Sequence, residues 1–286
     1  YIVYIYIATT IIMPYNRHRS KARTATRRAR AAKRSGNRYK ANRYKWNRYK
    51  GNHYKVICVL PAYNAEKTLE NTIEDIDRAW VDEIILVDDC SQDNTIELAK
   101  KLSIDQVIKH TKNLGYGGNQ KTCYQKALDQ KADIVIMVHP DHQYNPKLIP
   151  QMVKPIMENQ CDAVFGSRFV KESKVIDYPK KKLLLNRIFN LITKVLFLSD
   201  YNDFTNAFKI YKMNALLKTF PLVSESFNIF LELPLKIISR KMKYKIIPIS
   251  WANRKEGMSK FDIKELRAKY LFTLIYCLLE KILLKK

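Results

Sequence analysis

The chain has 286 residues, a formal net charge of +25, and a hydrophobic content of 47%. This length and composition suit one large globular domain with a substantial core, and they exclude a chain that is disordered throughout. The five cysteines are odd in number and none has C-x-x-C spacing. We therefore expect a reduced, cytoplasmic protein without a disulfide framework or a zinc site.

Residues 1–54 carry most of the basic excess, with fifteen Lys and Arg and no Asp or Glu. The stretch opens with a short apolar run and closes with repeats of the form Asn-Arg-Tyr-Lys. Basic residues interleaved with tyrosine could bind RNA or phospholipid. Low-complexity composition of this kind is also typical of a disordered extension, which is the structure we expect. Nucleic-acid binding through this tail remains an alternative function of another class.

From residue 55 onward, apolar strands alternate with helical patterns. The predicted strands are residues 56–60, 83–87, 106–109, 133–138, 162–165 and 244–249. The predicted helices are residues 66–78, a helix that ends at Lys101 behind the capping types Ser91 and Asp93, residues 118–130 and residues 146–159. This alternation predicts an α/β fold with a mostly parallel sheet covered on both faces. The remaining second half is predicted to be mostly helical.

Polar segments follow five of these strands. They are residues 61–66, 88–91, 113–119, 139–143 and 166–168. Ligands of open parallel sheets bind beyond the carboxyl ends of the strands, so we expect these segments to share one site. The first strand lacks the G-x-G-x-x-G sequence of a dinucleotide site, and the chain has no G-x-x-x-x-G-K-[ST] phosphate loop. A nucleotidyltransferase is also disfavoured, because no glycine-rich basic loop follows the first strand.

In this order and spacing, the motifs resemble family 2 glycosyltransferases of the GT-A fold, and most closely the dolichyl- and polyprenyl-phosphate sugar synthase branch. The resemblance covers about residues 55–261. It implies that three segments bind the nucleotide sugar. The residues concerned are Pro61, Tyr63, Asn64 and Glu66 after the first strand, Asp88 and Asp89 after the second, and Asn113, Gly115 and Gly117 in the third.

Residues 139–143 stand where this family carries its D-x-D metal motif. The resemblance implies that Asp141 and Gln143 hold a divalent cation, Mg²⁺ or Mn²⁺, against the diphosphate. His139 replaces the first Asp of the motif, and imidazole suits Mn²⁺ better than Mg²⁺. A second interpretation of His139 stays open, namely a histidine at a strand end that is hydrogen-bonded to its neighbours.

The resemblance also implies an acceptor site and a segment that covers the diphosphate. Arg168, Lys182, Asn186 and Arg187 would contact the acceptor phosphate, although residues 180–182 could equally be a solvated helix start. The R-x-x-G-x-S-K motif places Arg254, Ser259 and Lys260 over the leaving group and the acceptor. A phosphate acceptor needs no general base, whereas a hydroxyl acceptor does, and Asp203 is the candidate for that role.

Residues 269–286 form an apolar stretch that is too short to span a bilayer. It could lie in a membrane interface, or it could pack on the core or on a second subunit. We expect three parts: a basic extension at residues 1–54, a GT-A domain at residues 55–261, and an amphipathic helix at residues 262–286. The expected function is inverting transfer of a sugar from a UDP- or GDP-sugar, with a polyprenyl phosphate as acceptor and a saccharide or other hydroxyl as the alternative. No signal peptide is evident, so we expect peripheral attachment at the inner face of the membrane.

Overall fold

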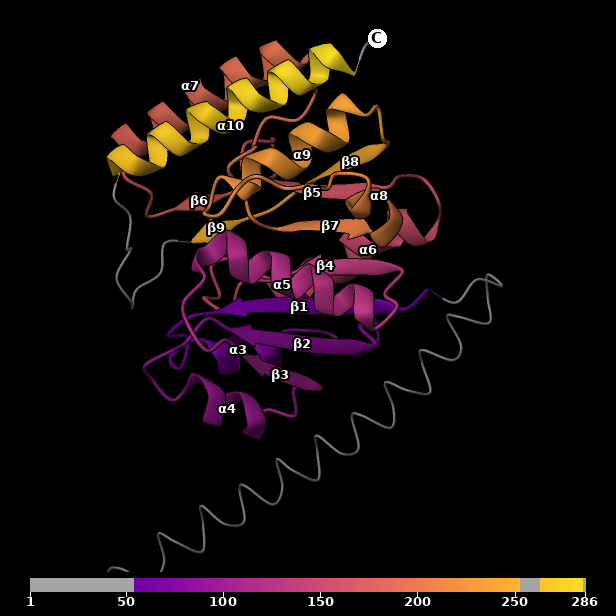
Figure 1. Ribbon diagram of the computed structural model, residues 1–286, viewed down its shortest axis with the longest axis vertical. Helices are drawn as coiled ribbons and strands as arrows, with labels where there is room; N and C mark the ends of the chain where they lie inside the picture. Colours follow the sequence, from indigo (N-terminus) through magenta and orange to yellow (C-terminus); the bar gives the residue numbers. More distant parts are fainter. Residues whose placement is uncertain (1–53, 253–262, 285–286) are drawn as a thin grey trace, which may run out of the picture. The chain divides into compact units, whose positions relative to one another are not determined.

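The computed structural model describes residues 54–252 and 263–284, with side chains from residue 268 onward in the second range. Figure 1 shows these elements in chain order. The predicted basic extension lies outside the described residues except for Tyr54. The strands are β1 (Val56–Ala62), β2 (Glu83–Asp88), β3 (Gln106–Lys109), β4 (Ile134–Met137), β5 (Ala163–Ser167), β6 (Val175–Ile176), β7 (Lys209–Lys212), β8 (Tyr244–Pro248) and β9 (Trp251–Ala252). The helices are α3 (Leu69–Glu74), α4 (Thr95–Lys101), α5 (Gly115–Asp129), the 3₁₀ turn η1 (Pro146–Leu148), α6 (Ile149–Met157), α7 (Lys180–Phe197), α8 (Met213–Leu217), α9 (Ile229–Ser239) and α10 (Ile263–Leu283).

Seven strands form the central sheet in the order β3-β2-β1-β4-β7-β5-β8. All neighbours are parallel except β7, which runs antiparallel to both β4 and β5. The α/β fold class with a mostly parallel sheet is therefore confirmed. Because β7 lies between β4 and β5, the sheet has one interior strand that the predicted strand–helix alternation did not contain.

Helices cover both faces of the sheet, and the alternation of side chains along each strand divides the core into two clusters. On β1, Ile57 and Val59 face a cluster that includes residues of α5, α7, α9 and α10. Val56, Cys58 and Leu60 face the other cluster, which includes residues of α3, α4 and α6. This period of two explains why the strands read as continuous apolar runs: both of their faces are buried.

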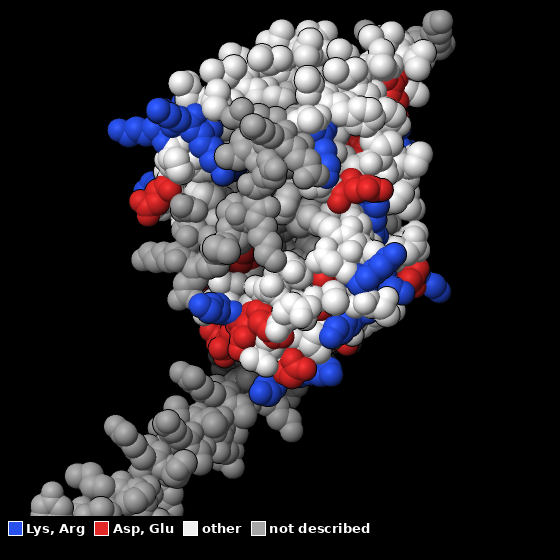
Figure 2. Space-filling model, turned by 60° about the vertical axis from the view of Figure 1, so that its left-hand side comes forward, with Lys and Arg blue, Asp and Glu red and all other residues white. Residues whose placement is uncertain are grey.

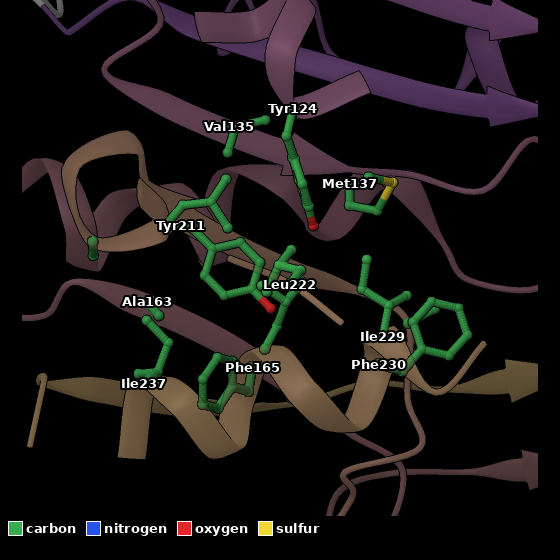
Figure 3. Close-up of a cluster of buried hydrophobic side chains, with 14 of the residues drawn as sticks. Tyr124, Val135, Met137, Ala163, Phe165, Tyr211, Leu222, Ile229, Phe230 and Ile237 are labelled. Carbon is green, nitrogen blue, oxygen red and sulfur yellow. The ribbon is translucent and has the colours of Figure 1, made fainter. Parts of the chain in front are cut away.

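Aromatic residues fill the space between α9 and the centre of the sheet (Figure 3). Tyr211 on β7 meets Tyr124 of α5 edge to face, with ring centroids 6.4 Å apart, and it meets Phe165 of β5 at 6.2 Å. Rings of this size bury much apolar area, so this cluster is a large contribution to the stability of the sheet.

Several element boundaries differ from the predicted ones. Strand β1 does not stop at Leu60 but continues through Pro61 to Ala62, where it pairs with the end of β2. The helix predicted at residues 66–78 is only α3, Leu69–Glu74. Helix α5 begins at Gly115, three residues before the predicted start, so its glycines lie inside the first turn. Gly166 and Ser167 are the last residues of β5 rather than part of the segment after it.

Helices α7 and α10 lie side by side at one end of the described fold (Figure 1). Phe189 of α7 packs on Tyr270 of α10, and further along both helices Lys281 donates a hydrogen bond to the carbonyl oxygen of Phe197 at 2.8 Å. The two helices therefore run in the same direction. Across the described ranges, no helix combines the length and the apolar character that a bilayer crossing requires.

Candidate functional site

The segments after β1 and β2 interlock through hydrogen bonds between their backbones and side chains. The backbone N–H of Asn64 donates to Ser91 Oγ at 2.9 Å, and Asn64 Oδ1 accepts the N–H of Gln92 at 2.8 Å. Glu66 accepts from Asn94, through the side-chain amide at 2.9 Å and the backbone N–H at 3.2 Å. Asn64 and Glu66 thus shape the rim of the sheet, and Tyr63 beside them is exposed.

Asp88 and Asp89 end β2 as two buried carboxylates with different surroundings. Asp89 accepts hydrogen bonds from His110 Nδ1 and from the backbone N–H of Leu114, each at 2.8 Å. Asp88 Oδ2 accepts the N–H of Ser91 at 2.9 Å, whereas its Oδ1 has no hydrogen-bond partner among the residues that the structure describes. A buried acceptor without a partner is costly, so this oxygen is suited to receive a donor group from a ligand.

The glycines at the start of α5 allow a close approach between two parts of the backbone. Gly115 has a φ of +75°, which favours glycine. A Cβ on Gly117 would lie 2.4 Å from the carbonyl carbon of Glu225, and the Gly117 N–H donates to that carbonyl oxygen at 3.1 Å. Asn113 stabilises the start of α5, because its Oδ1 accepts the backbone N–H of Gly115 at 3.0 Å. Packing against the segment at Glu225 therefore explains the glycines without any ligand.

The predicted metal residues follow β4. Asp141 Oδ1 accepts the N–H of Gln143 at 3.2 Å, and both side chains are partly exposed. Gln143 also reaches β9, where its Nε2 lies 3.5 Å from the Ala252 oxygen. Within the described ranges, no three His, Cys, Asp or Glu side chains gather as a metal cluster. One carboxylate and one amide fit a hard cation only if phosphate oxygens of a substrate complete its coordination.

His139 lies in an aromatic setting. Its Nε2 forms a hydrogen bond with the hydroxyl of Tyr116, and its ring centroid lies 5.1 Å from that of Tyr116 and 5.5 Å from that of Phe230. This geometry is that of a hydrogen-bonded histidine at a strand end. Tyr116 lies in the polar segment of residues 113–119. The sequence predicted no role for it, because only the fold brings it to His139.

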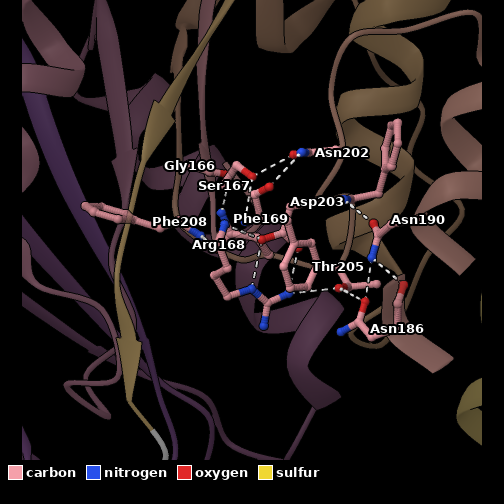
Figure 4. A network of polar contacts seen from close by, with 12 residues as sticks. Gly166, Ser167, Arg168, Phe169, Asn186, Asn190, Asn202, Asp203, Thr205 and Phe208 are labelled. Atoms are coloured by element: carbon pink, nitrogen blue, oxygen red, sulfur yellow. Dashed lines mark hydrogen bonds and ion pairs between the residues drawn. The ribbon is translucent and has the colours of Figure 1, made fainter. Parts of the chain in front are cut away.

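Arg168 and Asp203 form a buried ion pair at the end of β5 (Figure 4). Arg168 donates to Asp203 Oδ2 from Nε at 2.8 Å and to Oδ1 from Nη2 at 2.7 Å, and its backbone N–H also reaches Oδ2 at 2.8 Å. Burial lowers the pKa of Arg168, but Asp203, Tyr144 and Tyr178 together raise it above its usual value, so the guanidinium stays charged. Arg168 thus engages both oxygens of Asp203, the residue predicted as general base for a hydroxyl acceptor.

The other predicted acceptor residues lie on the first turns of α7, next to this ion pair. Asn186 Oδ1 accepts from the Thr205 hydroxyl at 2.9 Å, and Thr205 in turn accepts from Arg168. Arg187 is exposed and its guanidinium carbon lies 5.4 Å from the ring centroid of Phe169. Lys182 is also exposed and lies 5.8 Å from the ring centroid of Tyr178. These cations lie near the end of β5, whereas Asp88 and Asp89 lie near the end of β2. In the strand order, β1, β4 and β7 stand between the two groups.

Lys209 is a buried residue for which no role was predicted. It begins β7, the antiparallel strand, and its ammonium donates a hydrogen bond to the carbonyl oxygen of Asn206. Burial lowers the pKa of Lys209 to about 7, while Asp203 opposes this shift and Arg168 adds to it. Arg254, Ser259 and Lys260 lie outside the described residues.

Comparison with protein families identifies relatives that share these motifs. The family model described as "Glycosyl transferase family 2" matches residues 57–220.

An uncharacterized protein of Methanocaldococcus jannaschii is 29% identical over 224 residues, which cover 77% of this chain and 91% of that protein. The UDP-N-acetylglucosamine–dolichyl-phosphate N-acetylglucosaminyltransferase of Methanococcus voltae is 31% identical over 49% of this chain and 62% of its own length. The dolichol-phosphate mannosyltransferase of Pyrococcus furiosus is 28% identical over 73% of this chain and 60% of its own length. The chain thus spans about three fifths of the two relatives that have named activities.

Solved structures with the same fold include the glucosyl-3-phosphoglycerate synthase of Mycobacterium tuberculosis. Its complex with Mn²⁺, UDP and phosphoglyceric acid superposes with a TM-score of 0.61 at 16% identity, covering 79% of this chain and 78% of that one. A second complex, with Mn²⁺, UDP-glucose and phosphoglyceric acid, gives a TM-score of 0.60 at 18% identity over 79% and 80% of the two chains. At this identity the likeness shows the fold alone.

Proposed function

Because the chain belongs to glycosyltransferase family 2 and is a glycosyltransferase, we propose that it transfers a sugar, with inversion, from a UDP- or GDP-sugar to the phosphate of a polyprenyl phosphate. One observation carries this proposal. The carboxyl ends of β1, β2, β4 and β5 bring buried carboxylates, Asp141 and a group of cations to one edge of the sheet. Carboxylates that can receive a nucleoside stand on one side of that edge, and cations that suit a phosphate stand on the other.

On the donor side, the interlocked segments after β1 and β2 would hold the nucleoside. Asp88 Oδ1 is an acceptor in need of a donor, and the base or ribose supplies such groups. Pro61, Tyr63, Asn64, Glu66, Asp89, Asn113, Gly115 and Gly117 remain predicted donor-site residues. Asn64 and Glu66 would act mainly by fixing the two segments to each other.

Asp141 and Gln143 would hold a divalent cation, Mg²⁺ or Mn²⁺, together with the diphosphate oxygens. Such a cation neutralises the charge that develops on the leaving nucleoside diphosphate. His139 forms a hydrogen bond with Tyr116 through Nε2, so as a metal ligand it would bind through Nδ1. Arg254 and Lys260 remain predicted to cover the leaving group.

On the acceptor side, the proposed reaction needs no general base, because a phosphate oxygen is already anionic at neutral pH. This agrees with the state of Asp203, whose two oxygens are occupied by Arg168. Lys182 and Arg187 would bind the acceptor phosphate through charge-assisted hydrogen bonds. Ser259 is predicted to join them. Since the acceptor is borne by a lipid, the enzyme would work at a membrane surface, with its site toward the cytoplasm.

An acceptor assay tests this proposal. The full chain is incubated with UDP- and GDP-sugars, a divalent cation, and either a polyprenyl phosphate or the corresponding polyprenol. We expect a sugar-phosphate lipid from the first acceptor and no product from the second. The double variant Lys182→Gln/Arg187→Gln should raise the KM for the polyprenyl phosphate by about tenfold or more, since each lost charge contact is worth about 1.5–3 kcal/mol. Lys181→Gln, a change on the same exposed turn, is the control and should leave the KM unchanged. Transfer to the polyprenol alone would refute the phosphate acceptor.

A further inference from the structure

Helix α7 has its polarity reversed relative to an ordinary surface helix. The residues that it turns toward the protein include Asn186, Asn190 and Thr193. The residues that it turns outward are aliphatic, and Leu184, Leu191 and Val195 are each 60–61% exposed. Surface helices normally bury the apolar stripe and expose the polar one, so this arrangement needs a physical reason.

The polar face of α7 has partners inside the protein, and these partners fix the orientation of the helix. Asn190 Oδ1 accepts the backbone N–H of Phe204 at 2.6 Å, and Asn186 accepts from Thr205 (Figure 4). Turning the helix over would leave the Phe204 N–H buried and unpaired, which costs more than it would gain. The aliphatic side of α7 is therefore held outward by the network that also contains Arg168 and Asp203.

Helix α10 extends this aliphatic side. It runs parallel to α7, and its outward residues Phe272, Ile275 and Leu279 are 50–63% exposed. We call Leu184, Leu191, Val195, Phe272, Ile275 and Leu279 the α7–α10 apolar surface. Leu184 and Val195 are eleven residues apart on α7, and Phe272 and Leu279 are seven apart on α10, so at 1.5 Å per residue the surface is about 10–17 Å long. Apolar patches of this extent on a soluble protein mark an interaction site.

Charged residues border this surface and are almost all basic. Helix α7 begins with three lysines and has no acidic residue. Of the side chains that are described on α10, the one acidic group is Glu280, and it binds Arg240. Figure 2 shows the end of the molecule where α7 and α10 lie as mostly uncharged, with Lys and Arg atoms along one edge.

This charge pattern favours a lipid bilayer as the occupant over a second copy of the chain. A second copy would bring the same basic border without acidic groups to pair with it, whereas anionic headgroups supply such partners. Between Leu184 and Leu191 the outward face carries the exposed Arg187, whose positive charge suits a lipid phosphate. Neither helix can cross the bilayer, so the helices would lie in the boundary between headgroups and acyl chains.

We propose that the α7–α10 apolar surface docks the protein on a membrane, with α7 as well as the C-terminal helix inserted in the interface. The first turns of α7, with Lys182 and Arg187, would then lie at the depth of the lipid phosphates. The docking does not depend on the reaction, whereas this placement of the acceptor rests on the function proposed above.

Vesicle flotation tests the docking without any substrate. The full chain is mixed with phosphatidylcholine vesicles at high salt, where the basic residues contribute little because their attraction is screened. We expect the wild-type chain to float. Leu184→Gln/Leu191→Gln should lower the partition coefficient by at least about tenfold, because two exposed leucines no longer enter the apolar phase. The matched control is Leu217→Gln/Val223→Gln, two changes at exposed apolar residues outside the surface, and it should float like the wild type.

Three results would overturn the docking. The wild-type chain could remain unbound on neutral vesicles and on vesicles that also contain phosphatidylglycerol. The two double variants could float equally well. The wild-type chain could be a dimer without lipid that Leu184→Gln/Leu191→Gln converts to a monomer, in which case a second copy covers the surface. Thermal unfolding of each variant shows that it is folded.

A sugar-transfer assay tests separately whether docking places the acceptor phosphate at the start of α7. Leu184→Gln/Leu191→Gln should slow transfer to a polyprenyl phosphate that is carried in vesicles, and it should transfer normally to the same lipid dispersed in detergent. Equal slowing in both forms would contradict the proposed placement. A chain that floats but transfers no sugar in either form would refute the proposed function and leave the docking intact.

Discussion

Asp203 and Arg168 show how a long-range contact bears on a predicted chemical role. As a carboxylate near the acceptor side, Asp203 was a candidate general base, but the fold buries it and gives both of its oxygens to Arg168. Its spacing from Arg168 in the sequence, 35 residues, gave no sign of the pair. Roles that depend on a long-range contact of this kind could not be predicted from the motif alone.

Removing one partner of this pair should destabilise the fold. Asp203→Asn would leave the buried guanidinium uncompensated, and we expect the free energy of unfolding to fall by about 3–5 kcal/mol. Urea denaturation measures the change. The double variant Arg168→Met/Asp203→Leu should recover part of the loss, because it removes both charges. A loss below about 1 kcal/mol for Asp203→Asn would show that the pair is not buried as described.

Lys209 should make stability depend on pH. Its folded pKa of about 7 is below the ordinary lysine value of 10.5, so the unfolded chain binds the extra proton between these values. Stability from this group is therefore least below pH 7 and rises as the pH increases toward 10.5, with a slope of up to about 1.4 kcal/mol per pH unit. Denaturation of the wild type and of Lys209→Met from pH 7 to 9.5 (about the accessible range) measures this difference. Parallel curves for the two chains would contradict the depressed pKa.

His139 was the residue for which the sequence left two interpretations open. Its hydrogen bond with Tyr116 and its contact with Phe230 match the strand-end interpretation in this structure. The sequence identified the position as unusual because an imidazole stood in place of a carboxylate. It could not identify Tyr116 as the partner, since that residue comes from the start of α5.

At the scale of elements, the apolar runs predicted the parallel strands well, because strands buried on both faces have a continuous hydrophobic signature. β7 escaped prediction because Lys-Ile-Tyr-Lys has lysines at both ends and is only four residues long. The early start of α5 was missed for a different reason. Glycine weakens a helix, so residues 115–117 looked like a loop until their contact with Glu225 was visible.

The start of α5 makes a prediction about packing. Gly117→Ala would place a Cβ within 2.4–2.7 Å of the backbone at Glu225 and Ser226, which cannot move as a side chain does. We expect a loss of about 1–3 kcal/mol in the free energy of unfolding. Gly118→Ala is the comparison in the same turn: its Cβ would meet the Cβ of Leu114 at 2.8 Å rather than the backbone at Glu225, so any loss of stability there has a different origin. Equal stability of both variants and the wild type would show that α5 does not approach Glu225 this closely.

At the scale of the whole molecule, the fold separates the residues proposed to bind the donor from those proposed to bind the acceptor, across the edge of one sheet. The β3-β2-β1-β4 half carries the carboxylates, and β5 with α7 carries the cations. The sequence predicted this division because polar segments after parallel strands meet at one edge. It did not predict that α7 turns its aliphatic side outward, since that orientation depends on the hydrogen bonds of Asn190 and Asn186 with the residues after Asp203.

The proposed function depends on several segments at this edge that would bind a nucleoside diphosphate through a cation on Asp141. The most direct test is the thermal unfolding of the full chain with a panel of UDP- and GDP-sugars, with and without Mg²⁺ or Mn²⁺. A true donor at about 100 times its Kd should stabilise the fold by about 2.7 kcal/mol. We predict that this stabilisation requires the cation and is lost in Asp141→Asn, while Asp129→Asn on the far end of α5 retains it. Stabilisation that persists in Asp141→Asn without the cation, or none with any nucleotide sugar, would contradict the account.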